Sequence, residues 1–153
     1  GEEDRNGRRN FDEIKLWAAY LDGEPALVDD RGRAGGYSAD APFVLLGDLN
    51  AAPDSEEARY DGTAAITQLL EHPRLRDTGD VAVSAGAPAD NPRSTTAFRG
   101  RGARIDYVLP SVDLEVLDGG VFWPSEEQDA EARALAEEAS DHRLVWLRVR
   151  LGS

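Results

Sequence analysis

The fold is decided by the stretch Phe43-Val-Leu-Leu-Gly-Asp-Leu-Asn50, in which four consecutive apolar residues lead into a glycine and then into polar side chains. A short apolar run that ends at a turn residue predicts a β-strand buried on both faces, as in α/β proteins. Gly47 is expected to end the strand. Asp48 and Asn50 then lie at its carboxyl end, where open α/β sheets gather their ligands.

An amphipathic helix is predicted before this strand, because apolar residues recur at helical spacing between Asn10 and Leu21. The segment 22–42 is rich in Gly, Asp and Arg without periodicity and is expected to be a loop. A second helix is predicted over residues 62–71, since four apolar residues share one helical face and a His-Pro pair follows.

The rest of the chain predicts strands and one further helix. A short strand is expected at 81–83, and a meander of three strands at 105–109, 114–117 and 120–123. Residues 126–139 are acidic and rich in alanine, which predicts a surface helix that could serve as a lid. Alternation from Val145 to Leu151 predicts a last strand with one buried face.

Composition indicates one globular domain and narrows the classes of function. The chain has 153 residues, of which 41% are apolar and 31% charged, and it contains no long apolar run of the kind that spans a bilayer. The formal net charge is -13, which disfavours extended contact with nucleic acid. Cysteine is absent, so a bound metal would need oxygen or imidazole ligands.

Three short strings place a carboxylate at a strand end or turn: Gly47-Asp-Leu-Asn50, Arg104-Ile-Asp-Tyr-Val-Leu109 and Ser140-Asp-His-Arg143. Each string alone usually marks only a turn or a salt bridge. Their order, together with Pro53 and Ser55 after the first string, resembles the second half of the endonuclease/exonuclease/phosphatase superfamily. The resemblance extends from about Asn6 to Leu151, and the helix at residues 6–17 is similar to that of a bacterial, often exported, branch.

The resemblance implies an α/β fold in which residues 1–153 form the C-terminal half of a four-layer α/β sandwich, with a mixed sheet and flanking helices. The N-terminal half is then expected upstream of Gly1, together with the family's metal-binding glutamate, an asparagine and a histidine. The adjacent acids Glu2, Glu3 and Asp4 are a poor substitute for them. We expect the missing half, or a second copy, to cover the inner face of the sheet.

The resemblance also implies a role for each site residue. Asp48 is expected to orient or deprotonate the attacking water and to touch the metal, and Asn50 to donate its amide to phosphate oxygens. Asp141 is expected to bind the metal, which is Mg²⁺ with Mn²⁺ or Ca²⁺ as alternatives. His142 is expected to contact the phosphoryl group, and Asp106 to fix its tautomer.

The implied activity is metal-dependent hydrolysis of phosphate esters, by a phosphodiesterase, a phosphatase or a nuclease, with this chain supplying part of the active site. The alternative is a non-catalytic binding module or an inactive fragment of a family member. The acidic charge makes small organic phosphates or lipid head groups at least as suitable as nucleic acid. An exported location fits the bacterial branch.

Other polar and aromatic residues have less specific interpretations. Arg99, Arg101 and Arg104 lie in a Gly-rich stretch, where they either bind substrate phosphate or are simply solvated. His72 is expected at a helix end or on the surface. Each of the three tryptophans lies in an apolar pattern and is expected in the core: Trp17, Trp123 and Trp146.

Overall fold

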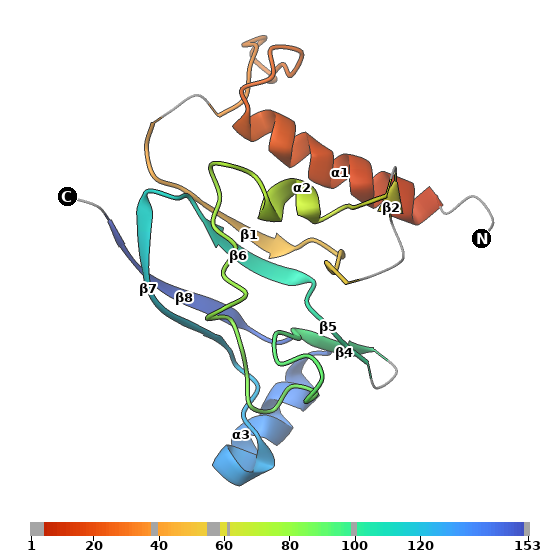
Figure 1. The fold of residues 1–153 in the computed structure, drawn as a ribbon, viewed down its shortest axis with the longest axis vertical. Helices are drawn as coiled ribbons and strands as arrows, with labels where there is room; N and C mark the ends of the chain where they lie inside the picture. Colours follow the sequence, from red (N-terminus) through yellow and green to blue (C-terminus); the bar gives the residue numbers. More distant parts are fainter. Residues whose placement is uncertain (1–4, 38–39, 55–58, 61, 99–100, 152–153) are drawn as a thin grey trace.

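The structure, a computed structural model, describes residues 5–37, 40–54, 59–60, 62–98 and 101–151. It has the mixed α/β character that the sequence predicts (Figure 1). In chain order the described elements are α1 (Arg5–Leu21), β1 (Val44–Asp48), β2 (Arg59–Tyr60), β3 (Thr63–Ala64), α2 (Thr67–Leu70), β4 (Thr96–Phe98), β5 (Arg101–Ala103), β6 (Asp106–Pro110), β7 (Leu114–Val121), α3 (Glu126–Ala139) and β8 (Val145–Leu151).

The strands of the described residues form four two-stranded ladders, β1–β6, β2–β3, β4–β5 and β7–β8, and all four are antiparallel. The predicted mixed sheet is therefore not observed in this part of the chain. The physical reason is that the apolar pattern of a strand reports its burial and says nothing about the direction of its neighbour. Each described helix is also too short or too polar to traverse a lipid bilayer.

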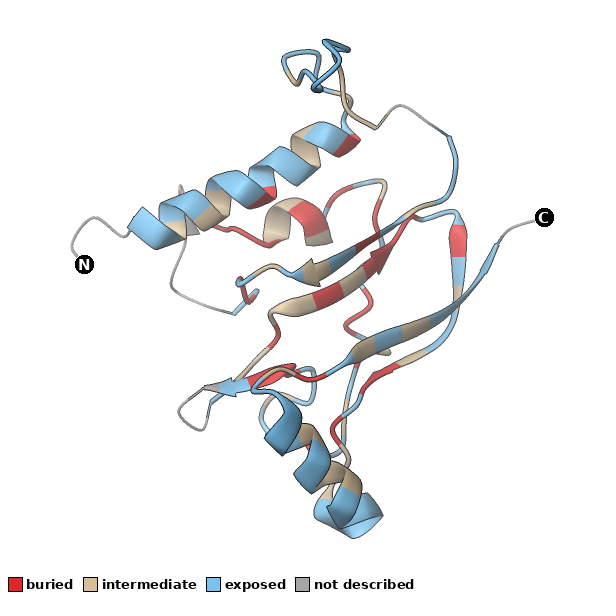
Figure 2. Ribbon diagram, turned by 180° about the vertical axis from the view of Figure 1, so that it is seen from behind, coloured by how far each residue is buried: buried red, intermediate tan, exposed pale blue. Residues whose placement is uncertain are grey.

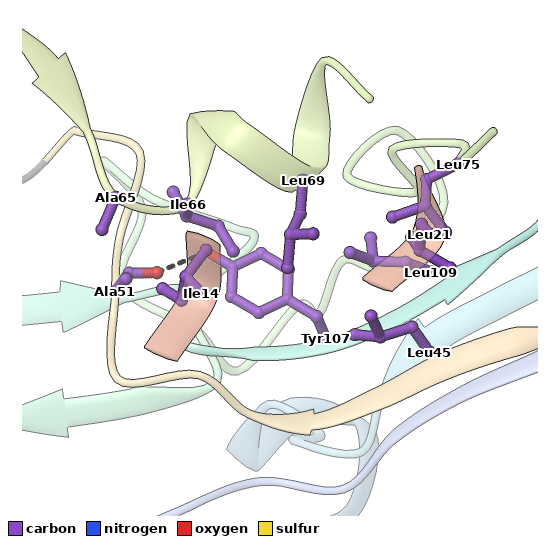
Figure 3. Close-up of a cluster of buried hydrophobic side chains, with 10 residues drawn as sticks. All are labelled: Ile14, Leu21, Leu45, Ala51, Ala65, Ile66, Leu69, Leu75, Tyr107 and Leu109. Carbon is purple, nitrogen blue, oxygen red and sulfur yellow. Dashed lines mark hydrogen bonds between the residues drawn. The ribbon is translucent and has the colours of Figure 1, made fainter. Parts of the chain in front are cut away.

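The main core lies between the two N-terminal helices and one face of the β1–β6 ladder. Figure 3 shows side chains from α1 and α2 pointing toward β6 and β1 around the ring of Tyr107. The Tyr107 hydroxyl lies 2.7 Å from the carbonyl oxygens of both Ala51 and Arg104. This contact joins the segment after β1 to the start of β6, and so it fixes the two places from which the site residues project.

The opposite face of the β1–β6 ladder is open. Leu45 points into the core and is 9% exposed, whereas the next residue, Leu46, is 68% exposed. Figure 2 shows the same contrast along β1, where a buried segment lies among exposed and intermediate ones. The prediction of a strand buried on both faces is therefore wrong for the described residues, because helices cover only one of them.

β1 also keeps one edge unpaired within the described structure, where its ladder partner is β6 alone. Backbone hydrogen bonds run from Leu49 N–H to the Ile105 carbonyl and from Ser111 N–H to the Phe43 carbonyl. They show which opposing residues of the ladder are hydrogen-bonded pairs. In an antiparallel pair the bonded residues alternate, so the backbone groups of Val44 and Leu46 point away from β6.

In the second half of the chain, a smaller apolar cluster joins Ala82 and Ala87 to Val121, Trp123 and Val145. The helix α3 connects the end of β7 to the start of β8 (Figure 1). β7 is one strand rather than the predicted two, with an irregularity between Val116 and Asp118. Its glycines do not break it, because they make room for the neighbouring strand: a Cβ at Gly119 would lie 2.4 Å from Leu147 Cδ2. The bounds of α3 and β8 are those predicted. The predicted buried face of β8 is not observed among the described residues, because none of its side chains is fully buried.

Other local expectations are corrected. The helix predicted at 62–71 shrinks to α2, because Thr63–Ala64 pairs with β2. The strand predicted at 81–83 is absent from the described structure, where these residues belong to a turn, a bend and irregular chain. Of the three tryptophans only Trp123 is in the core, at 4% exposed. Trp17 and Trp146 are instead 46% and 40% exposed.

Candidate active site

Two carboxylates face each other where β1 ends and β6 begins. The register of the ladder pairs Asp48 with Asp106, and both side chains project from the open face. Hydrogen-bonded and non-hydrogen-bonded pairs alternate along the ladder, and Asp48 and Asp106 form a non-hydrogen-bonded pair, in which opposing side chains come closest. Because like charges directly opposite each other destabilise a sheet, a cation or a proton nearby would stabilise this arrangement.

His142 follows the C-terminal end of α3 and brings an imidazole to this pair. Its Nδ1 atom lies 3.0 Å from both carboxylate oxygens of Asp106. An isolated antiparallel bridge between His142 and Thr96 holds the backbone at this point. The contact with Asp106 orients the ring, and Nε2 has no hydrogen-bond partner among the described residues, so it is available to a ligand.

Electrostatics favour the charged form of this imidazole. The hydrogen bond to Asp106 raises the pKa of His142 above its ordinary value, and partial burial opposes the shift. The negative charges of Asp106, Asp48 and Asp141 raise the pKa further. His142 can therefore carry a proton closer to neutral pH than an isolated histidine, which suits a group that donates to a phosphoryl oxygen.

Asn50 is held against Asp48 by a tight local turn. Its backbone N–H donates to Asp48 Oδ1 at 2.8 Å, and its side-chain Nδ2 donates to Oδ2 at 3.1 Å. Asn50 adopts the left-handed conformation, with φ of 48°, which asparagine tolerates better than most residues. Asn10 of α1 donates to the Asn50 carbonyl at 3.1 Å, so the first helix supports the turn.

Asp141 lies beside this group rather than within it. Its side chain is exposed and borders a hollow of about 640 Å³ between α3 and the segment 86–88. Its backbone carbonyl accepts a hydrogen bond from the Thr96 hydroxyl at 2.8 Å. Asp141 is near enough for its charge to act on His142, but Asp48, Asp106 and His142 form the closer cluster.

The donor atoms of this cluster fit a hard divalent cation in part. Asp48, Asp106 and His142 each offer one ligand atom, and these atoms lie within 4.8 Å of one another. Carboxylate oxygens are the ligands that Mg²⁺ and Ca²⁺ prefer, and Mg²⁺ usually keeps several waters. Asp106 is already bonded to His142, which leaves Asp48 as the carboxylate most available to a cation.

The structure thus brings together Asp48, Asn50, Asp106 and His142, with Asp141 at the margin. The sequence did not single out Thr95, whose buried hydroxyl lies 2.6 Å from Asp106 Oδ2. A run of three small hydroxyl residues at 94–96 was the available signal. Hydroxyl residues in loops are too common for that signal to stand out.

Arg104 has a structural position that neither interpretation of the Gly-rich stretch anticipates. Its side chain is 4% exposed, pairs with Asp77 at 2.7 Å, and stacks over the Tyr107 ring at 4.6 Å. Arg104 therefore braces β6 behind the site and is neither solvated nor a phosphate ligand. Five other residues named from the sequence lie outside the described part: Glu2, Glu3, Asp4, Ser55 and Arg99.

Comparison with known proteins agrees with this geometry. The model of the Endonuclease/Exonuclease/phosphatase family matches residues 4–142, a range that contains every candidate site residue. No significant match was found among curated proteins or among solved structures. Members of the matched family are hydrolases that act on phosphoesters. Because the family match spans most of the sequence, the chain belongs to the endonuclease/exonuclease/phosphatase family.

Proposed function

We propose that this chain supplies part of the active site of a divalent-metal-dependent phosphoric ester hydrolase. The observation that carries the proposal is the cluster of Asp48, Asp106 and His142 on the open face of β1–β6, with an imidazole already oriented by a carboxylate. An oriented imidazole beside a second, exposed carboxylate provides a proton donor and a proton acceptor within one small space.

Each residue has a distinct part in the proposed reaction. Asp106 accepts from Nδ1–H of His142, so the opposite nitrogen, Nε2, is presented to the phosphoryl group. When the ring is protonated, which its raised pKa favours, Nε2–H donates a proton or hydrogen bond to that group. Asp48 accepts a proton from the attacking water or orients that water. Asn50 has a second amide hydrogen, which we propose contacts a phosphate oxygen.

We further propose that Asp48 and Asp141 would hold the cation, most suitably Mg²⁺. When bound, the cation would neutralise charge on phosphoryl oxygens and lower the pKa of a coordinated water. Neither carboxylate has a strong partner of opposite charge among the described residues: Asp48 is bonded only by Asn50, and Asp141 is exposed. Both therefore remain available as oxygen ligands.

The charge of the chain bears on the substrate class. With a net charge of -13, the chain repels an extended phosphate backbone, so a small organic phosphate or a lipid head group is favoured over nucleic acid. Arg133 and Arg143 also border the hollow beside Asp141, together with Glu137. This balance of charges suits a small polar ligand better than a long polyanion.

We also propose that a second sheet of the same domain covers the open face, as in the four-layer sandwich that the family resemblance implies. The support is a set of exposed apolar side chains: Val44 and Leu46 on this face of β1, and Val149 and Leu151 on β8. Without that sheet, and without its metal-binding glutamate, the chain alone is expected to show no appreciable turnover. If sedimentation experiments instead show a dimer at every protein concentration, a second copy of the chain would be the element that covers the open face.

Cation binding can be tested on the chain itself. Titration calorimetry with Mg²⁺ and Mn²⁺ should show weak binding that decreases in Asp48→Asn and Asp141→Asn. Asp113→Asn is the matched control, because Asp113 is also exposed and lies beyond the opposite end of β6. Parent-like binding by both site variants would remove these carboxylates from the metal site.

Turnover is tested with a generic phosphodiester and a phosphomonoester in the presence of Mg²⁺, with and without the N-terminal half of the domain. We expect turnover only from the complete domain, and a large loss of that turnover in His142→Ala. A complete domain that binds phosphate esters without hydrolysing them would favour the alternative, a non-catalytic binding module.

A further inference from the structure

A buried threonine next to the site has every hydrogen-bonding position of its hydroxyl occupied. Thr95 is 1% exposed and lies immediately before β4. Its Oγ1 donates to Asp106 Oδ2 at 2.6 Å and accepts from the backbone N–H groups of Ile105 and Asp106, each at 3.1 Å. The Ala103 carbonyl, at 3.5 Å, is too far away to compete for the hydroxyl proton.

This arrangement fixes the direction of the hydroxyl and, through it, the carboxylate. A threonine hydroxyl has one proton and two acceptor positions, and the two backbone donors fill both acceptor positions. The proton must then point to Asp106, where a short bond to an ionised acceptor is among the stronger hydrogen bonds in proteins. The carboxylate is thereby held with its oxygens toward Nδ1 of His142.

The same short segment also holds the backbone that carries His142. The Thr95 carbonyl accepts from Arg143 N–H at 2.7 Å, and Thr95 N–H donates to the Ala103 carbonyl at 2.8 Å. The next residue, Thr96, forms an isolated antiparallel β-bridge with His142, and its hydroxyl donates to the Asp141 carbonyl. Both members of the carboxylate–imidazole pair are therefore anchored to residues 95–96, although they come from separate parts of the chain.

We infer that Thr95 is a positioning residue: its hydroxyl sets the rotamer of Asp106, which in turn holds the His142 ring as the Nδ1–H tautomer with Nε2 turned to substrate. The catalytic consequence rests on the proposed function, whereas the orientation of the ring does not. If Thr95 only filled space in the core, a side chain of the same shape without the hydroxyl would serve equally well.

The test compares Thr95→Val, which keeps the shape and loses the hydroxyl, with Thr95→Ser, which keeps the hydroxyl. Thr78→Val is the matched control, because Thr78 is also 1% exposed and its hydroxyl donates to the Val108 carbonyl rather than to the pair. The readout is the tautomer of His142, taken from its ring ¹⁵N shifts at one pH well above the imidazole pKa. His72 is the only other histidine and serves as an internal reference.

We expect the parent, Thr95→Ser and Thr78→Val to hold His142 as the Nδ1–H tautomer, and Thr95→Val to show a mixture with Nε2–H. A folded Thr95→Val with the parent's tautomer would overturn the inference. If Thr95→Val does not fold, the test is made on the parent protein. Its Thr95 hydroxyl proton should then exchange slowly with water and show a nuclear Overhauser contact to the His142 ring. A rapidly exchanging hydroxyl proton would overturn the inference.

In the complete domain, Thr95→Val should lower kcat about 10- to 100-fold with little change in KM, and Thr95→Ser should restore most of the loss. The two proposals fail differently. If the proposed hydrolysis is wrong, no variant turns over substrate while the tautomer pattern still holds. If the positioning role is wrong, the parent is active and the tautomer is unaffected by loss of the hydroxyl.

Discussion

At the scale of single residues, the pH response of His142 follows from its neighbours. Because its hydrogen bond to Asp106 raises its pKa, we expect an NMR titration to place the His142 midpoint above the ordinary value of about 6.5. Asp106→Asn should lower that midpoint, since it removes the first cause of the shift. An unchanged midpoint in this variant would show that the contact is not made in solution.

The raised pKa of His142 also predicts the direction in which folding stability changes with pH. A pKa that is higher in the folded state stabilises that state below the unfolded pKa of about 6.5, and the contribution is lost as pH rises through the folded value. The stability difference between the parent and Asp106→Asn should therefore be largest in mild acid and smaller above the raised pKa. Denaturant unfolding at several pH values measures this difference.

A second prediction concerns the buried guanidinium of Arg104. Asp77→Asn removes its charged partner while Arg104 stays 4% exposed, so we expect a loss of about 1–3 kcal/mol in the free energy of unfolding. Asp80→Asn, a substitution of an exposed neighbouring aspartate, should change stability by less than about 0.5 kcal/mol. Equal effects of the two substitutions would argue against the ion pair.

Much of the candidate site could be predicted from the sequence at this scale, because Asp48, Asn50, Asp106 and His142 stand in short strings with recognisable order. Thr95 and Arg104 could not be interpreted correctly in the same way. Their roles depend on burial and on polar partners elsewhere in the chain, namely Asp106 for Thr95 and Asp77 for Arg104.

At the scale of secondary-structure elements, β1 allows a direct comparison of its two faces. Leu45→Ala should cost about 2–4 kcal/mol, because Leu45 packs in the main core. Leu46→Ala should cost less than about 1 kcal/mol in this chain, since its side chain is 68% exposed. Chemical denaturation of the two variants measures this contrast, and a large loss in Leu46→Ala would mean that the open face is covered in solution.

Elements with strong local signals were predicted well. α3 begins with a capping box at Ser125 and Gln128, and β8 has uninterrupted alternation, so both appear with the predicted bounds. The β7 strand was divided in two at Asp118-Gly119, because these residues are typical of a turn. Gly119 is instead required by packing against β8, which is a contact between distant segments and leaves no local pattern.

At the scale of the whole molecule, the α/β class followed from the sequence, but the arrangement of the sheets did not. The apolar run of β1 indicated two buried faces, and the described structure covers only the one that carries Leu45 and Tyr107. A pattern of side chains records how much surface is to be buried. It does not record which segment buries it, so the open face and the direction of strand pairing had to come from the structure.

The unpaired edge of β1 has a consequence for handling the purified protein. An exposed strand edge is a template for pairing between molecules, and charged side chains are a common protection against it. Within Val44–Asp48 the only charge is that of Asp48 at the carboxyl end, and mutual repulsion of a -13 chain provides the remaining protection. Both protections weaken as carboxylates gain protons, so we expect light scattering to increase in acidic buffers toward the isoelectric point. Leu46→Lys, which adds a charge in mid-strand, should delay that precipitation, and storage at neutral or higher pH with low salt should keep the protein dispersed.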